Sequence, residues 1–117
     1  MLMKTILLTS VVAIASSIAA PLAAAGQDAA AIKTGQQVYG AQKCQVCHAI
    51  AGTGNKNNPL DKVGAKLSAA EIREWIVNPA EMTKKSNSTK KPPMPPKYAK
   101  LAAAEIDGLV AYLQSLK

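Results

Sequence analysis

The only histidine of this 117-residue chain and both of its cysteines lie within five consecutive positions, in the segment KCQVCH. Two residues separate Cys44 from Cys47, and His48 follows directly. Chance would produce this arrangement with a probability on the order of 10⁻⁴, given how few copies of these residue types the chain has. The cluster is therefore treated as one chemical unit, around which the rest of the chain has to fold.

The N-terminal segment has the organisation of an export signal. A basic residue precedes an uncharged apolar run, and a small-residue A-x-A cleavage pattern ends at Ala25. A retained membrane anchor is the alternative, because the uncharged stretch 5–27 is long enough to cross a bilayer. Pro21 and the prevalence of Ala and Ser over Leu favour cleavage. We therefore expect a signal peptide over residues 1–25, one domain over 26–117, and no membrane attachment after cleavage.

Charge and composition indicate the kind of partner and a need for additional core. The chain carries 14 basic and 7 acidic residues, a net charge of +7, which favours acidic protein surfaces or anionic polymers as partners. It contains no Phe, one Trp and three Tyr. This is a thin apolar inventory for a small domain, which buries a low fraction of its surface in any case. A bound group with apolar area of its own would supply the missing core.

Apolar spacing predicts three helices. The first covers residues 28–42, the second begins at a capping box formed by Ser68 and Glu71 and ends before Pro79, and the third runs to the C-terminus. The positions that carry this spacing are Ile32, Gly35, Val38 and Tyr39 in the first helix, Ile72, Trp75 and Ile76 in the second, and Ile106, Leu109, Val110, Leu113 and Leu116 in the third.

Long connecting segments separate these helices. The segment AGTGNKNNPLDKVG is rich in Gly and Asn and predicts a loop. The segment MTKKSNSTKKPPMPPKY is expected to be irregular, with a stiff polyproline stretch around Met94. No run alternates apolar and polar residues over the length of a strand, and nothing repeats internally. The sequence predicts an all-α fold in which the terminal helices pack together, with a short middle helix and long loops that wrap a missing partner.

Three chemistries fit the cysteine–histidine cluster poorly. A thioredoxin-like redox pair requires a βαβ pattern, which the sequence lacks. A structural zinc site requires four ligands, and the chain has no further Cys or His to complete the set. A structural disulfide is compatible with export, but it would close a very small loop and leave His48 without a role.

Covalent attachment of a c-type haem gives every member of the cluster a role. C-x-x-C-H is the signature of this attachment. Two thiols one helical turn apart can each add to a vinyl group of the porphyrin, and the adjacent imidazole then binds the iron as its proximal ligand. Export agrees, because bacteria attach haem in this way outside the cytoplasm. The sequence therefore predicts one covalently bound haem c, with its iron, at Cys44, Cys47 and His48.

With the motifs KCQVCH, NPL, EIREWI, PPMPP and EIDGLVAYLQSL, the chain from about residue 32 to its end resembles the class I cytochromes c, small soluble bacterial electron carriers with one haem. The resemblance implies the cytochrome c fold, with crossing N- and C-terminal helices and loops wrapped around the haem. The residues at that crossing are Gly35 and Tyr39 on one helix and Leu109 and Tyr112 on the other. The chain departs from the family at Ala102, where Ser or Thr commonly caps the last helix. It forgoes a cap of about 1 kcal/mol, so we expect a frayed helix start.

The same resemblance assigns the remaining site residues. Met94 lies in a proline-bearing loop before the last helix and matches the second axial ligand of the iron, and the neighbouring prolines restrict its backbone. Met82 is the competing thioether, with no rigid backbone expected. Pro59 and Leu60 match a proline whose carbonyl accepts the other ring N–H of the proximal histidine and a leucine that packs on the haem. Trp75 resembles an aromatic residue near a haem propionate, although its spacing equally suits a core residue.

An iron bound by imidazole and thioether is coordinatively saturated, so the resemblance implies one-electron transfer rather than enzymatic activity. We expect a monomeric periplasmic carrier between respiratory or other redox partners that have acidic docking surfaces, with no nucleic-acid partner. The lysines around Met94 that would meet such surfaces are Lys84, Lys85, Lys90, Lys91, Lys97 and Lys100. Two alternatives stay open: an electron-transfer subunit of a larger dehydrogenase or oxidase complex, and a ligand-binding haem protein with an open sixth position.

Overall fold

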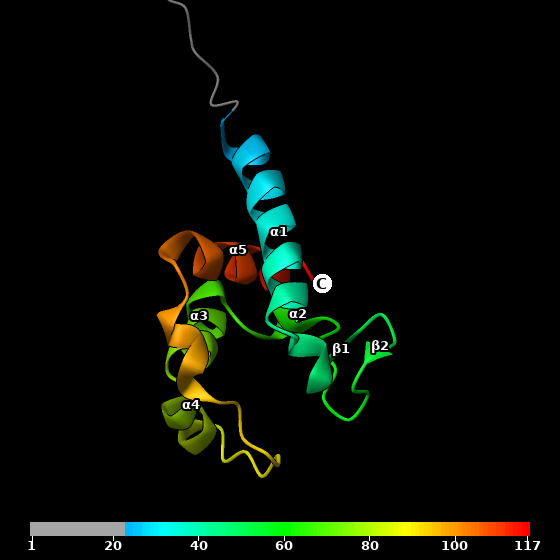
Figure 1. Cartoon of the computed structure of the whole chain (residues 1–117), viewed down its shortest axis with the longest axis vertical. Coiled ribbons are helices and arrows are strands. Elements are labelled where there is room, and N and C mark those ends of the chain that lie inside the picture. Colours follow the sequence, from blue (N-terminus) through cyan, green and yellow to red (C-terminus); the bar gives the residue numbers. More distant parts are fainter. Residues whose placement is uncertain (1–22) are drawn as a thin grey trace, which may run out of the picture.

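The computed structural model describes residues 23–117, with side chains from residue 29 onward, and the cleavage of a signal peptide over 1–25 stays a prediction. The elements, with η for a 3₁₀ helix, are α1 (Ala23–Ala41), η1 (Cys44–Val46), β1 (Ala49–Ile50), β2 (Thr53–Gly54), α2 (Val63–Lys66), α3 (Ala69–Val77), α4 (Pro79–Lys85), η2 (Pro96–Lys100) and α5 (Ala103–Gln114). Figure 1 shows α1 crossing α5, with α3, α4 and η2 on one side of α1 and the β1–β2 hairpin on the other. This mostly helical arrangement confirms the all-α prediction. None of the helices among the described residues is long and apolar enough to span a bilayer.

The crossing of α1 and α5 is the most extensive packing between two elements of the described chain. A Cβ atom on Gly35 would overlap the carbonyl oxygen of Gly108, and one on Gly108 would lie 2.9 Å from the backbone nitrogen of Gly35. Beside this contact the rings of Tyr39 and Tyr112 meet edge to face, with centroids 5.8 Å apart and planes at 80°. The predicted crossing of the terminal helices is confirmed. Gly108, which the sequence analysis did not single out, supplies its second small surface.

The hydrophobic core is small and is built by α1, α3 and α5. Its buried members are Val38, Ile72, Ile76, Ile106, Leu109 and Val110. These are residues of the three helical stripes that the sequence pattern predicted. The partly buried residues that pack against them are Tyr39, Leu67, Val77, Met94, Tyr98, Leu101 and Leu113. This second set includes Met94 and Tyr98, so the proline-rich segment covers part of the core.

The middle of the chain forms two helices where the sequence predicted one. The Ser68 hydroxyl accepts a hydrogen bond from the Glu71 N–H at 3.2 Å, and the Glu71 carboxylate accepts one from the Ser68 N–H at 2.7 Å, which confirms the capping box. Pro79 then opens α4 at the first helical position, where its missing N–H removes no helical hydrogen bond. The prediction of irregular chain over 82–85 is wrong, because a proline that stops one helix can begin the next. Met82 therefore lies on a helix.

Two short strands form a hairpin, of which β1 directly precedes the segment predicted as a loop and β2 lies inside it. They are antiparallel, and their register pairs Ala49 with Gly54. Ala51 and Gly52 between them have positive φ values of 50° and 79°, as a two-residue hairpin turn of the primed type requires. Strands of two residues are too short to show alternation, so the sequence pattern could not predict them.

Both ends of α5 are held by neighbouring residues. At its start Ala102 offers no side-chain acceptor, but the Glu105 carboxylate accepts a hydrogen bond from the Ala102 N–H at 3.4 Å, which is one half of a capping box. At its end Gly64 on α2 donates its N–H to the Leu116 carbonyl at 2.8 Å, and the Gln114 Nε2 donates to the Gly64 carbonyl at 2.6 Å. The end of α5 and the residues that follow it are thereby fixed to α2.

Candidate haem site

The Cys-x-x-Cys segment forms one tight turn directly after α1. Lys43 adopts the left-handed backbone conformation, with φ 56° and ψ 40°, where the chain leaves α1 and enters η1. The N–H groups of Cys47 and His48 both donate to the Cys44 carbonyl, at 3.2 and 3.0 Å. Cys44 is half-buried, Cys47 is exposed, and both are free. Two thiols one turn apart are therefore available for attachment.

His48 has a defined hydrogen-bond partner. Its Nδ1 lies 3.2 Å from the carbonyl oxygen of Asn58, and because a carbonyl only accepts, Nδ1 carries the proton. The Nε2 lone pair is then free for a metal. Burial lowers the pKa of His48, with the hydrogen bond to Asn58 opposing, and this favours the neutral ring that metal ligation requires.

The acceptor of the His48 hydrogen bond differs from the one that the resemblance assigned. That assignment to the Pro59 carbonyl is wrong by one residue, because the Asn58 carbonyl faces the ring. Ala49 pairs with Pro59 in an isolated parallel bridge, in which the Ala49 N–H donates to Asn58 at 3.3 Å and the Leu60 N–H donates to Ala49 at 2.8 Å. Asn58 and Leu60, on either side of Pro59, therefore make the hydrogen bonds of this bridge. Pro59 is exposed and Leu60 half-buried, and the packing of Leu60 on a haem stays a prediction.

Gly54 is a site residue that the sequence analysis missed. It has a φ of +107°, and a Cβ atom there would overlap the carbonyl oxygen of His48. The N–H of the following residue, Asn55, lies 3.0 Å from that carbonyl oxygen. Only a glycine allows the returning hairpin strand to approach the haem-attachment turn this closely. The Gly-rich pattern of AGTGN predicts a loop, and an isolated Gly in such a segment also marks a close backbone approach.

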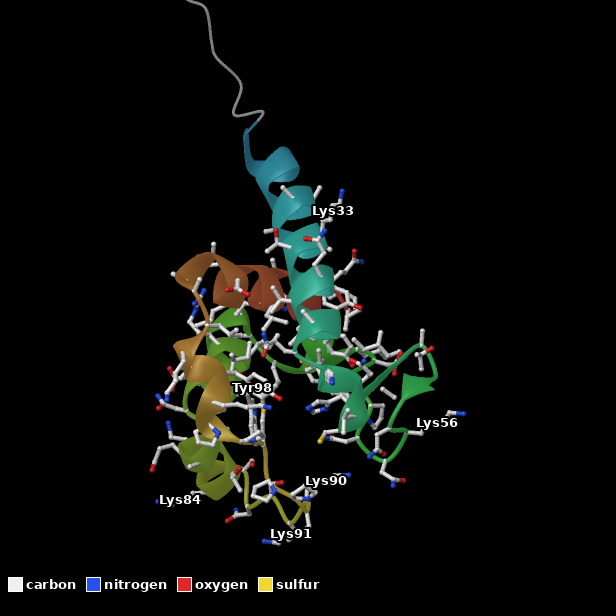
Figure 2. The ribbon with its side chains drawn as sticks, viewed as in Figure 1. Lys33, Lys56, Lys84, Lys90, Lys91 and Tyr98 are labelled. Carbon is white, nitrogen blue, oxygen red and sulfur yellow. The ribbon has the colours of Figure 1, made fainter. Side chains whose placement is uncertain are left out.

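Met94 lies in the loop between α4 and η2, half-buried and packed against the hydrophobic core. The Pro95 that follows it is extended, with φ −76° and ψ 151°, and Pro96 begins η2, so the backbone after Met94 is restricted. The same loop reaches the His48 side of the molecule, since Lys90 (Figure 2) donates from Nζ to the Asn57 carbonyl oxygen at 2.8 Å. The loop that contains Met94 thus contacts the loop whose Asn58 carbonyl accepts the His48 hydrogen bond. Ligation of the iron by Met94 stays a prediction.

Tyr98 is a second residue that the sequence analysis did not assign to the site. It packs against the core, and its side chain extends from η2 toward η1 (Figure 2). Burial raises the pKa of Tyr98, and the charges of Cys44 and Cys47 raise it further, so the phenol lies within electrostatic reach of both thiols. The Lys97 ammonium lies 5.2 Å from the centroid of the Tyr98 ring, a cation–π distance. A single aromatic residue in a proline-rich segment has no periodicity that would have indicated this position.

Trp75 and Met82 differ from Met94 in their packing. Trp75 is half-buried on α3, and Met82 is half-buried on α4. Neither belongs to the residues that pack against the hydrophobic core in the described part of the chain, whereas Met94 does. The core alternative for Trp75 therefore gains no support from packing, and its contact with a haem propionate stays a prediction.

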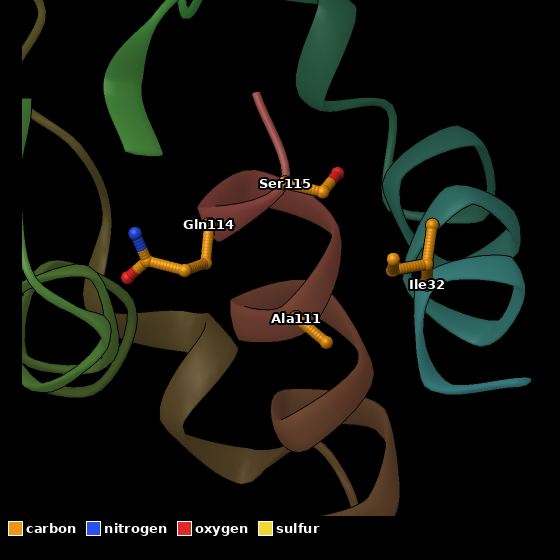
Figure 3. Close-up of a pocket in the computed structure, with 4 residues that line it drawn as sticks. All are labelled: Ile32, Ala111, Gln114 and Ser115. Atoms are coloured by element: carbon orange, nitrogen blue, oxygen red, sulfur yellow. The ribbon is translucent and has the colours of Figure 1, made fainter. Parts of the chain in front are cut away.

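Surface hollows of the described chain lie beside α1. One, of about 240 Å³, is lined by Ile32, Ala111, Gln114 and Ser115 between α1 and α5 (Figure 3). Another, of about 420 Å³, lies between the end of α1, η1 and the hairpin, and Tyr39 and Gln45 line it. The Tyr39 hydroxyl and the Gln45 Oε1 are buried without a hydrogen-bond partner among the described residues. Within 23–117, no group of three or more His, Cys, Asp or Glu side chains is placed to hold a metal ion.

The donor set in the described residues suits an iron porphyrin. Cys44 and Cys47 offer two thiols on one turn, and His48 offers a neutral imidazole whose Nε2 is free. Met94 adds a thioether, on a loop whose Lys90 donates to the Asn57 carbonyl next to the Asn58 acceptor of His48. These are the groups that hold the haem of a His/Met cytochrome c.

Comparison with family models gives a match to the cytochrome c family over residues 32–117. The comparisons with curated proteins and with solved structures returned no match. The matched region contains the cysteine–histidine turn, the Met94 loop and the crossing of α1 and α5. Because the match covers most of the sequence, the chain belongs to the cytochrome c family.

Proposed function

We propose that this protein is an exported one-electron carrier whose haem iron is held between His48 and Met94. A cytochrome c domain carries covalently attached haem c, and membership of the family implies haem-based electron transfer rather than enzymatic turnover. The observation that carries the proposal is the 3.2 Å contact of His48 Nδ1 with the Asn58 carbonyl, because it leaves Nε2 for iron.

Each residue of the site has a distinct task in this proposal. Cys44 and Cys47 hold the macrocycle through two thioethers, and the Asn58 carbonyl orients His48 and raises the basicity of Nε2. Met94 supplies a sulfur ligand that favours the reduced iron. With His48 and Met94 both supplied by the chain, no ligand position at the iron would be left for a substrate. The bound haem then supplies a reversible one-electron change.

Optical spectroscopy of the purified holoprotein tests the proposal. Haem that resists extraction with acidified acetone, together with a weak sulfur-to-iron charge-transfer band in the oxidised form, is the expected result. Carbon monoxide added to the reduced protein should leave the spectrum almost unchanged, because the sixth position is occupied. Rapid formation of a carbon monoxide complex would instead indicate a ligand-binding haem protein with an open position.

Replacing Met94 separates the two candidate thioethers. We predict that Met94→Leu abolishes the charge-transfer band and lowers the reduction potential by on the order of 0.1 V or more, because axial ligands move haem potentials over about 0.8 V. Met82→Leu is the matched control, and it should leave both properties unchanged. The reverse result, with the change in Met82→Leu alone, would assign ligation to Met82.

The lysines of α4 and the following loop support a further proposal, that the redox partners present acidic docking surfaces. Figure 2 shows Lys84, Lys90 and Lys91 on the same end of the molecule. Such a charged face raises association rates by about 10 to 10³ at low ionic strength, and salt screens the effect. Stopped-flow reduction by an acidic partner protein should therefore slow markedly as salt is added. A rate that does not depend on salt would contradict steering by these lysines.

Export to the periplasm is tested separately, by N-terminal sequencing of the protein from a periplasmic fraction. We predict that the mature chain begins at Gly26 and is monomeric by size. An intact N-terminus with the protein in the membrane fraction would indicate a retained anchor. Stoichiometric co-purification with a catalytic subunit would instead identify the chain as part of a larger dehydrogenase or oxidase complex.

A further inference from the structure

We propose that Asn55 is a positioning residue for the axial ligand His48. It joins the haem-attachment turn to the loop that orients the imidazole. This inference rests on the proposed ligation of the iron by His48. It adds a residue that the cysteine–histidine motif does not contain and that touches neither the iron nor its ligands through its side chain.

The backbone of Asn55 contacts both structures that it joins. Its N–H lies 3.0 Å from the His48 carbonyl oxygen and 3.1 Å from the Gln45 carbonyl oxygen, so it is shared between two carbonyls of the attachment turn. Its own carbonyl accepts the N–H of Asn58 at 3.3 Å. Gly54 makes this approach possible, because any Cβ there would meet the His48 carbonyl.

The side chain of Asn55 also links the attachment turn to the loop that orients His48. Its Nδ2 donates to the Val46 carbonyl at 3.4 Å, on the exposed side of η1. Its Oδ1 accepts the N–H of Asn57 at 3.0 Å, which closes a turn in the loop. One amide therefore bonds to the attachment turn with its nitrogen and to the His48-orienting loop with its oxygen. An amide side chain supplies both a donor and an acceptor for this, whereas a carboxylate or a hydroxyl in the same place would leave one arm weaker or unmade.

This connection bears on the iron through the Asn58 carbonyl. That carbonyl receives the His48 Nδ1 proton, and Asn58 is three residues along the chain from Asn55. If the Asn55 side chain is removed, the loop is held to η1 by backbone contacts alone, so the Nδ1–carbonyl bond is made for a smaller fraction of the time. A weaker bond makes the imidazole less basic and less able to stabilise ferric iron. The midpoint potential then moves in the positive direction.

The test compares Asn55→Ala with Asn57→Ala in the purified holoprotein. Asn57 is exposed in the same loop, and in the part of the chain that the structure describes its side chain makes no hydrogen bond, while its backbone groups survive the substitution. Two quantities are measured: the solvent-exchange rate of the His48 Nδ1 proton by NMR of the reduced protein, and the midpoint potential. We expect Asn55→Ala to exchange about tenfold faster than wild type and to shift the potential positively, with Asn57→Ala unchanged in both.

Other outcomes would overturn the positioning role of Asn55. Equal values for both variants, either at the wild-type level or shifted together, overturn the positioning role and leave the proposed carrier function intact. A wild-type protein without covalently retained haem overturns both. If Asn55→Ala does not mature, Asn55→Ser replaces it, because a serine keeps a weaker form of the bond to the Asn57 N–H and loses the Val46 arm. It should give smaller changes in the same direction, and wild-type values for Asn55→Ser also overturn the proposal.

Discussion

Whether α1 and α5 can cross depends on the absence of one Cβ atom. At Gly35 an added methyl group would meet the Gly108 carbonyl, which belongs to the backbone and cannot rotate away. Gly40, on the same helix, has no atom within 4 Å of its notional Cβ. Two glycines of one helix therefore have opposite meanings, and only the positions of other helices distinguish them. At Gly35 the structure shows a packing glycine, because the backbone of α5 occupies the space that a side chain would need.

We predict that Gly35→Ala lowers the free energy of unfolding by about 1–3 kcal/mol, the typical cost of overpacking a close contact. Gly40→Ala is the matched control, and it should raise that free energy by about 0.5–1 kcal/mol, because alanine reduces the entropy of the unfolded chain without a clash. Thermal and denaturant unfolding of the holoprotein measure both. Equal destabilisation in the two variants would contradict the close crossing.

Tyr39 provides a prediction about alkaline pH. Burial raises the pKa of Tyr39 to about 12, with the neighbouring charges of Cys44, Tyr112 and Asp61 adding to the effect. The unfolded state has the lower pKa, near 10, so it loses its proton first as the pH rises. The stability contributed by the neutral phenol is complete below pH 10 and is lost between pH 10 and 12.

Tyr39→Phe should therefore flatten the fall of stability over this pH range. At neutral pH it should also be neutral or stabilising by about 1 kcal/mol, because it removes a buried hydroxyl that has no partner among the described residues. Denaturant unfolding of wild type and variant at pH 7, 10 and 11.5 measures both effects. A parallel fall in the two proteins would show that other groups control the alkaline loss.

At the scale of elements, helix boundaries are set by local chemistry, and the sequence predicted them where that chemistry is complete. Ser68 and Glu71 form both bonds of a capping box at α3. At α5 Ala102 has no oxygen to contribute, and only the Glu105 arm is present. Pro79 shows the limit of such signals, since the same residue ends one predicted helix and opens another that was not predicted.

We predict that Ala102→Ser completes the second capping box and stabilises the protein by about 1 kcal/mol. For a domain of this size that corresponds to a rise in Tm of about 4–8 °C. Ala104→Ser, inside the first turn of the same helix, is the control and should be neutral or slightly destabilising, because serine is a poorer helix former than alanine. Thermal unfolding followed by circular dichroism measures both, and a rise in the control alone would refute the cap argument.

At the scale of the whole molecule, a small core is closed by the proline-rich loop and the short η2 rather than by a further α-helix. The buried side chains come from α1, α3 and α5, and the proline-rich segment adds Met94 and Tyr98 at the edge. A domain with so little buried apolar area depends on additional contacts for its stability. Haem c, which the family carries, would add apolar area to a core of this size.

We predict that the double variant Cys44→Ala, Cys47→Ala, which lacks both attachment points, unfolds at a much lower temperature than the holoprotein. It should keep part of its far-ultraviolet helical signal and lose the near-ultraviolet signal of fixed side chains, as expected when packing is lost before helices are. Circular dichroism in both regions measures this. A cooperative transition at the wild-type Tm would show that the polypeptide alone specifies the packed core.

Chemistry that is local in the chain was predictable from the sequence. The C-x-x-C-H cluster, the α3 cap and the apolar stripes of α1, α3 and α5 each rest on spacings within one turn or one helix, and the structure places them as predicted. The residues that the sequence analysis missed act over longer separations. Gly108 meets Gly35, Gly54 meets the His48 carbonyl, and Tyr98 packs against the core. No local pattern in the sequence records which residue will lie opposite another.

The sequence by itself determined that this chain holds two thiols and an imidazole on one turn, within a helical domain too lean in apolar residues to be complete alone. Only the tertiary structure decided that the Asn58 carbonyl, rather than that of Pro59, receives the His48 proton. The physical reason is that spacing along the chain fixes which groups share a turn. The direction of a carbonyl ten residues away depends on the pairing of two backbone segments, and that pairing is settled only when the hairpin and its loop have folded against each other.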